Sequence, residues 1–139
     1  MTKTHHSLAF DIALLANRLS LGLYFAKAGY GKVFGHGMDK WMEIFRSNQP
    51  PWLPGWFAVS YGYALPFVEM LVGLLLVLGM FSRKTAAVMS LMLVSFIIGA
   101  SGLGHEHLPF HPNVLLLTLA LLLAVTGAGR LSVDALRRK

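Results

Sequence analysis

The sequence predicts an all-α integral membrane protein: a four-helix bundle with a short amphipathic interfacial helix in its first outer loop. Hydrophobic residues make up 55% of the 139 residues and charged residues only 13%, whereas soluble domains carry about 25% charged residues. Four apolar segments are each close to the roughly 20 residues that a helix needs to cross a bilayer. Basic residues gather at the ends of these segments instead of forming one solvated stripe.

The predicted spans belong to a single domain of residues 1–139 and cover about 12–34, 56–80, 85–103 and 113–131. Helices are expected because unpaired backbone groups cost several kcal/mol each in lipid. The first segment contains Ala26-Lys27-Ala28, which looks like a signal-peptide cleavage site, but Arg18 interrupts its apolar core and indicates a retained helix. The fourth span is the shortest, with Pro112 near its first turn and Gly127 and Gly129 at its end.

The distribution of Lys and Arg predicts that both termini are cytoplasmic. The inner side would hold Lys3, Arg83, Lys84, Arg130, Arg137, Arg138 and Lys139, and the outer side Lys32, Lys40 and Arg46. The three tryptophans, Trp41, Trp52 and Trp56, fall on the outer side, as an interfacial aromatic belt requires. Charge and aromatic positions therefore indicate the same orientation.

The first outer loop and the C-terminal tail each contain a helical pattern. Spacing places Met38, Trp41, Met42 and Phe45 on one face, which predicts a short helix lying in the plane of the interface. Prolines 50, 51 and 54 follow it. In the tail, Ser132 is a candidate cap for a final basic turn.

Two charged residues, Arg18 and Glu69, fall inside predicted spans, where a charge costs a few kcal/mol or more unless it is paired or hydrated. Each belongs to a face with three- and four-residue spacing; the faces are Arg18, Gly22, Phe25, Gly29 and Lys32, and Gly62, Pro66, Glu69, Gly73 and Leu76. Glycines Gly22, Gly29 and Gly73 would let the two helices approach closely. We expect an enclosed Arg18–Glu69 pair, which either fixes helix register or, with Lys32, lines a site for an amphipathic ligand.

Histidines in the outer loops are candidate metal ligands: His105, His107 and His111, with His36 on the same side of the membrane. The alternative is that they are ordinary polar residues of an interfacial loop. The chain has no cysteine, which excludes iron–sulfur ligation and covalent haem attachment by this chain. Net charge is +6, yet the scattered basic positions argue against a nucleic-acid partner.

Several short motifs resemble the DoxX family of small bacterial membrane proteins. They are residues 18–25 with Gly29 and Lys32, then residues 69–73 and 78–83, and finally residues 127–134. The resemblance implies a four-helix membrane bundle in the bacterial cytoplasmic (inner) membrane. It also implies an association with redox chemistry, because some relatives are subunits of thiosulfate:quinone oxidoreductases. Matching positions on this chain are Arg18, Gly22, Gly29, Lys32, Glu69, Gly73, Gly129, Arg130 and Asp134.

Two functions follow as expectations. The first is a quinone-linked redox subunit, an accessory membrane subunit of an oxidoreductase, in which Arg18 and Glu69 bind a quinone and a partner protein supplies the redox centre. The second is a non-catalytic membrane scaffold or a carrier of a lipid or small molecule. In either case the partners expected are the lipid bilayer and a homo-oligomer or membrane redox complex. The sequence leaves open whether the protein is an enzyme.

Overall fold

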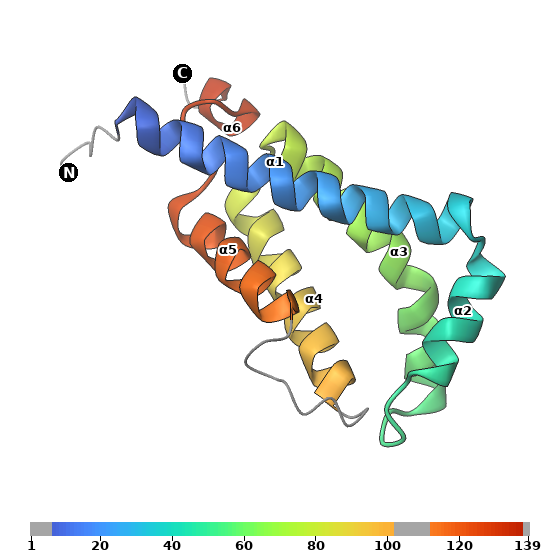
Figure 1. The fold of residues 1–139 in the computed structure, drawn as a ribbon. Coiled ribbons are helices and arrows are strands. Elements are labelled where there is room, and N and C mark those ends of the chain that lie inside the picture. Colours follow the sequence, from blue (N-terminus) through green and yellow to red (C-terminus); the bar gives the residue numbers. More distant parts are fainter. Residues whose placement is uncertain (1–6, 102–111, 138–139) are drawn as a thin grey trace.

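The computed structural model describes residues 7–101 and 112–137, which form helices joined by short connections and contain no strand (Figure 1). The elements in order are α1 (Leu8–Tyr30), the π-helix η1 (Gly31–Gly35), α2 (Met38–Ser47), α3 (Gly55–Leu78), α4 (Ser82–Ser101), α5 (Pro112–Thr126) and α6 (Val133–Leu136). The predicted all-α class is therefore confirmed for these residues.

Among the described residues, three helices are long and apolar enough to cross a membrane: Leu8–Gly35, Gly55–Leu78 and Ser82–Gly99. The fourth predicted span corresponds to α5, which has 15 residues and ends at Thr126 instead of Leu131. Gly127 and Gly129 have φ angles of 81° and 71°, a left-handed conformation that cannot continue a helix. At about 1.5 Å per residue, α5 is about 22 Å long, shorter than the hydrocarbon core of a bilayer.

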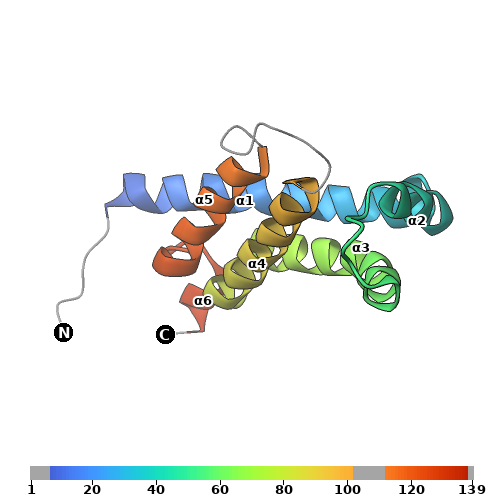
Figure 2. The same cartoon turned by 90° about the horizontal axis from the view of Figure 1, so that it is seen from below.

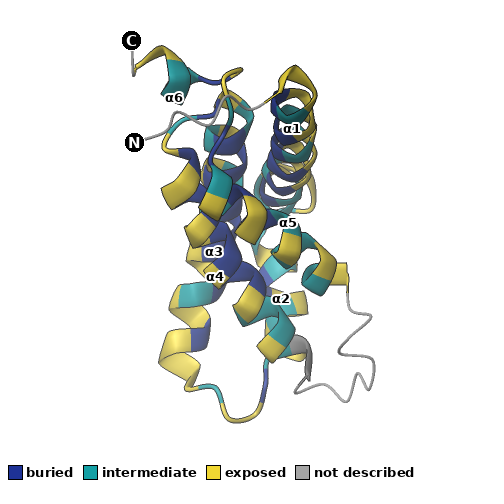
Figure 3. Cartoon of the chain, turned by 90° about the vertical axis from the view of Figure 1, so that its left-hand side faces the viewer, coloured by how far each residue is buried: buried dark blue, intermediate teal, exposed yellow. Residues whose placement is uncertain are grey.

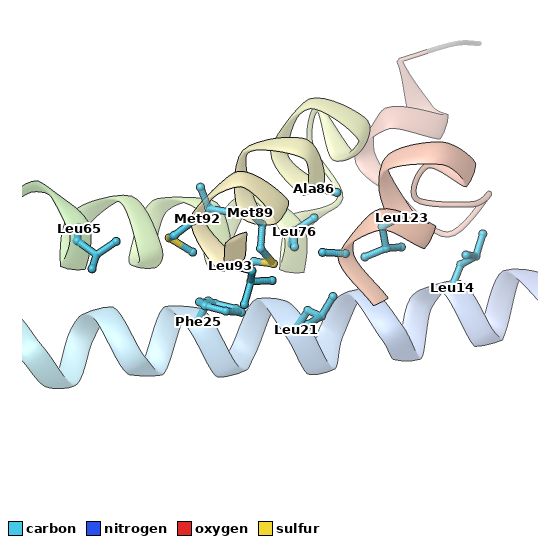
Figure 4. Packing of buried hydrophobic residues seen from close by; sticks show 12 residues of the cluster. Leu14, Leu21, Phe25, Leu65, Leu76, Ala86, Met89, Met92, Leu93 and Leu123 are labelled. Carbon is cyan, nitrogen blue, oxygen red and sulfur yellow. The ribbon is translucent and has the colours of Figure 1, made fainter. Parts of the chain in front are cut away.

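The helices pack as two pairs that share one core. Helix α1 lies along α3 over most of its length, and α4 lies beside α5 (Figures 1 and 2). The α4–α5 pair crosses α1 obliquely (Figure 1). Leu21 and Phe25 of α1 point toward Leu76, Met89 and Leu93 where the pairs meet (Figure 4).

Exposed large apolar side chains cover the outer faces of these helices, and buried residues face inward (Figure 3). Examples are Leu71 of α3, Leu91 of α4 and Leu115 of α5, all of which are exposed. A soluble protein rarely exposes so many large apolar residues together. The surface is therefore that of a protein whose solvent is lipid.

A helix, α2, occupies the segment predicted to be an amphipathic interfacial helix, and its apolar face packs on α3. Its position in the membrane interface stays a prediction. Met42 is buried and lies against Gly62. Phe45 is in ring contact with Tyr61, at 6.2 Å between centroids. The predicted cap in the tail is also present, since Ser132 Oγ accepts a hydrogen bond from the Ala135 amide at the start of α6.

Candidate functional site

Arg18 and Glu69 are both almost fully buried, with exposed fractions of 3% and 1%, but they do not pair with each other. The predicted Arg18–Glu69 pair is wrong. Arg18 Nη2 donates to the carbonyl of Leu131 at 2.8 Å, in the segment that precedes α6. The guanidinium extends toward the end of α3, where Gly79 has no Cβ to obstruct it. The Arg18 side chain therefore extends away from the middle of the span, toward the carbonyl group of Leu131.

Glu69 pairs instead with Lys32, the last residue of the predicted α1 face. Lys32 Nζ lies 2.6 Å from both carboxylate oxygens of Glu69. The side chain of Glu69 is 2% exposed and that of Lys32 is 22% exposed. The ion pair thus has one enclosed member and one member that reaches a surface.

Close contact between α1 and α3 brings this pair together. A Cβ on Gly22 would lie 2.8 Å from the carbonyl oxygen of Gly73, and a Cβ on Gly29 or Gly73 would collide with the backbone of the facing helix. All three positions therefore lack space for any side chain. The backbones can approach because glycine occupies them, as small residues commonly allow in membrane helix pairs.

Trp41 links α2 to the same place. Its indole Nε1–H donates to the carbonyl of Gly62 at 2.8 Å. That carbonyl has no helical partner because residue 66, four positions later, is a proline without an N–H. The ring of Trp41 also lies 4.4 Å from Lys32 Nζ, a cation–π contact.

A cavity of about 490 Å³ opens beside Lys32, between α2, α3 and α4 and the segment after α2. Its walls are mostly apolar and include six aromatic residues: Trp41, Phe45, Trp52, Phe57, Tyr61 and Phe96. Its polar lining comes from Lys32, Asn48, Gln49, Tyr61 and Ser95. This volume is in the range of small-molecule sites, which are typically apolar with a few polar groups.

Tyr61 and Ser95 form a second polar point on the cavity wall. The Tyr61 hydroxyl hydrogen-bonds to Ser95 Oγ, joining α3 to α4. Ser95 Oγ also donates to the carbonyl of Met92 at 2.6 Å. Neither residue was predicted as a site residue, although Tyr61, Leu65 and Glu69 are four residues apart and so share one face of α3.

Two further carboxylates, the buried Asp11 and the partly buried Asp134, tie the C-terminal segment to the start of α1 and of α4. Asp11, 1% exposed, accepts hydrogen bonds from the backbone N–H of Arg130 at 3.0 Å and from its Nε at 2.7 Å. Asp134 accepts from the backbone N–H groups of Phe81 and Ser82 at 2.8 and 2.7 Å, which caps α4. Neither carboxylate lines the cavity. Asp11 was missed because the first span was predicted to begin one residue later.

The proposed metal ligands cannot be assembled from the described residues. His105, His107 and His111 lie outside them, and His36 is exposed at the end of η1. Within residues 7–101 and 112–137, no group of three or more His, Asp or Glu side chains is placed to hold a metal ion.

Long apolar helices with lipid-type surfaces and enclosed charges define a helical integral membrane protein. A model of the DoxX family matches residues 13–102, and the chain belongs to that family. It is 30% identical over 136 residues to the inner membrane protein YqjF of Escherichia coli (strain K12), covering 93% of this chain and 95% of that protein. No solved structure matches the chain.

Proposed function

We propose that this DoxX protein is a quinone-binding subunit that works with a redox partner in the cytoplasmic membrane. The observation that carries the proposal is the aromatic cavity with Lys32 in its wall. Flat rings suit aromatic walls, and an ammonium group donates to a carbonyl oxygen, so a quinone head group matches both features. The exposed apolar surface of the helices fits a protein that takes its ligand from the bilayer.

The geometry moves the proposed site away from Arg18. Lys32 would donate a hydrogen bond to the quinone carbonyl. Glu69, which is buried and does not line the cavity, would position Lys32 through their ion pair. Trp41 would fix the ammonium group from a third direction. The electrons for any reduction would come from the redox centre of the partner protein, and this chain would supply the binding site.

Ligand binding by the purified protein in lipid nanodiscs tests the proposal. Decylubiquinone should quench the fluorescence of Trp41 and Trp52, which line the cavity. In the double variant Lys32→Gln/Glu69→Gln we expect about tenfold weaker binding, because a hydrogen bond to a charged group contributes about 1.5–3 kcal/mol. Removing both charges avoids leaving one of them buried without a partner.

The matched control is Lys27→Gln, which makes the same change at an exposed position on α1 outside the cavity lining. The affinity of this variant for decylubiquinone should equal that of the wild type. Comparison with it corrects for partition of the quinone into lipid. Equal affinity in the double variant and the control would refute the site at Lys32.

A non-catalytic scaffold is the second candidate, and the hydrogen bonds of the C-terminal segment favour it. Asp11, Arg18 and Asp134 all bind backbone groups of other elements and so serve packing. A scaffold would bind no quinone but would still co-purify with a membrane partner. Organic extraction of the purified protein separates the two candidates, because only the first should yield quinone.

A further inference from the structure

The two polar points of the cavity differ in the direction of the hydrogen bonds that they offer. At one point, Lys32 Nζ is an ammonium group with three protons and no lone pair. The two oxygens of Glu69, each at 2.6 Å, engage two of the protons. Lys32 can therefore only donate to a ligand.

At the other point, Tyr61 can only accept. Ser95 has a single hydroxyl proton, and it is donated to the carbonyl of Met92, which has none to give. Ser95 Oγ must then be the acceptor in its bond with Tyr61, and the tyrosine proton points at Ser95. The phenolic oxygen of Tyr61 consequently presents lone pairs to the cavity.

We infer that the cavity binds a hydroxyl-bearing ring, the reduced quinol, more tightly than the quinone. The hydroxyl groups of a quinol both donate and accept, so a quinol can donate to Tyr61 as well as accept from Lys32. A quinone carbonyl only accepts, and at Tyr61 two sets of lone pairs would face each other. The identity of the ring rests on the proposed function; the preference between its two forms rests on Ser95 and Tyr61 alone.

Isothermal titration calorimetry in nanodiscs, under anaerobic conditions, compares decylubiquinol with decylubiquinone. One hydrogen bond contributes about 1 kcal/mol, so the wild type should bind the quinol about fivefold more tightly. Tyr61→Phe should abolish this difference, because it removes both the acceptor for the quinol hydroxyl and the lone pairs that face the quinone carbonyl. Ser95→Ala should shift the preference toward the quinone, because the Tyr61 proton is then free to be donated to a carbonyl.

Two substitutions serve as matched controls. Tyr63→Phe removes the hydroxyl of an exposed tyrosine on α3, and Ser60→Ala removes an exposed serine whose Oγ also bonds a backbone carbonyl. Neither residue lines this cavity, so both variants should keep the wild-type preference.

Each outcome is decisive. Equal affinity for both forms in the wild type, or a quinol preference that survives Tyr61→Phe, overturns the inference; if binding still depends on Lys32, the proposed function stands. Binding of neither form overturns both.

Discussion

Asp11, Arg18 and Glu69 are buried charges with three different kinds of partner, and Arg18 is only partly satisfied, because its Nε and Nη1 are buried without a hydrogen bond. Asp11 binds both the backbone and the side chain of Arg130, and Arg18 binds a backbone carbonyl. Glu69 binds the side chain of Lys32, which is itself partly exposed to a cavity. Lys32–Glu69 is thus an enclosed pair with one member that a ligand can reach.

Replacing Lys32 alone should destabilise the protein more than replacing the whole pair. Lys32→Met leaves Glu69 buried without its partner, which costs about 3–5 kcal/mol when a buried pair is broken. Lys32→Met/Glu69→Leu should recover most of that loss. Thermal unfolding in detergent micelles measures both, with Lys27→Met as the exposed control. A double variant as unstable as Lys32→Met would contradict this account.

Residue spacing predicted which side chains are buried, but not which of them touch. Both predicted faces are enclosed, including Arg18, Gly29, Glu69 and Gly73. The choice between Arg18 and Lys32 as the partner of Glu69 depends on the relative shift of two helices along their axes. That shift is set by the contacts of Gly22 and Gly29 with α3, which one helix pattern cannot reveal.

At the scale of elements, α2 and α3 are joined through a defect in α3. Pro66 leaves the Gly62 carbonyl without its helical donor, and Trp41 of α2 supplies a replacement. The sequence contained both parts of this arrangement, a proline within a span and an amphipathic helix before it. The hydrogen bond from Trp41 to Gly62 could not be predicted, because it depends on the turn at Gly37, where φ is 85°.

Trp41 and Pro66 should be coupled energetically. Trp41→Phe removes the indole donor from Gly62, which should cost about 1 kcal/mol or more in the wild type. In a Pro66→Ala background the new backbone N–H can bond the same carbonyl, so Trp41→Phe should cost less. A double-mutant cycle of unfolding free energies measures this coupling.

The control for the cycle is Trp56→Phe, at an exposed tryptophan near the start of α3. It should show no coupling to Pro66→Ala. Additive costs for Trp41→Phe and Pro66→Ala would mean that the Gly62 carbonyl is not their common partner.

At the scale of the whole molecule, composition and apolar segments were sufficient to predict an all-α membrane protein. The span ends were less accurate where backbone conformation decides them. Helix α4 begins at Ser82, earlier than predicted, because Asp134 from the far end of the chain caps it. Helix α5 ends early at the left-handed Gly127. The orientation of the bundle in the membrane stays a prediction.

Single cysteines can test that orientation, because the natural chain has none. We expect Arg137→Cys to react with a membrane-impermeant maleimide only after the cytoplasmic membrane is permeabilised. Asn48→Cys, in the exposed outer segment after α2, should react in intact spheroplasts. The reverse pattern of labelling would place the C-terminal tail outside and the segment after α2 inside.

Asp11 and Asp134 also constrain when the fold can be completed during synthesis. Asp11 binds a residue 119 positions later, and Phe81 and Ser82 receive their cap from Asp134, 53 and 52 positions later. A ribosome must therefore have made nearly the entire chain before either set of hydrogen bonds can form. Until then the first helices are in the membrane and Asp11 does not yet have Arg130 as its partner. A nascent chain stalled before residue 130 would therefore be a natural substrate for membrane quality control.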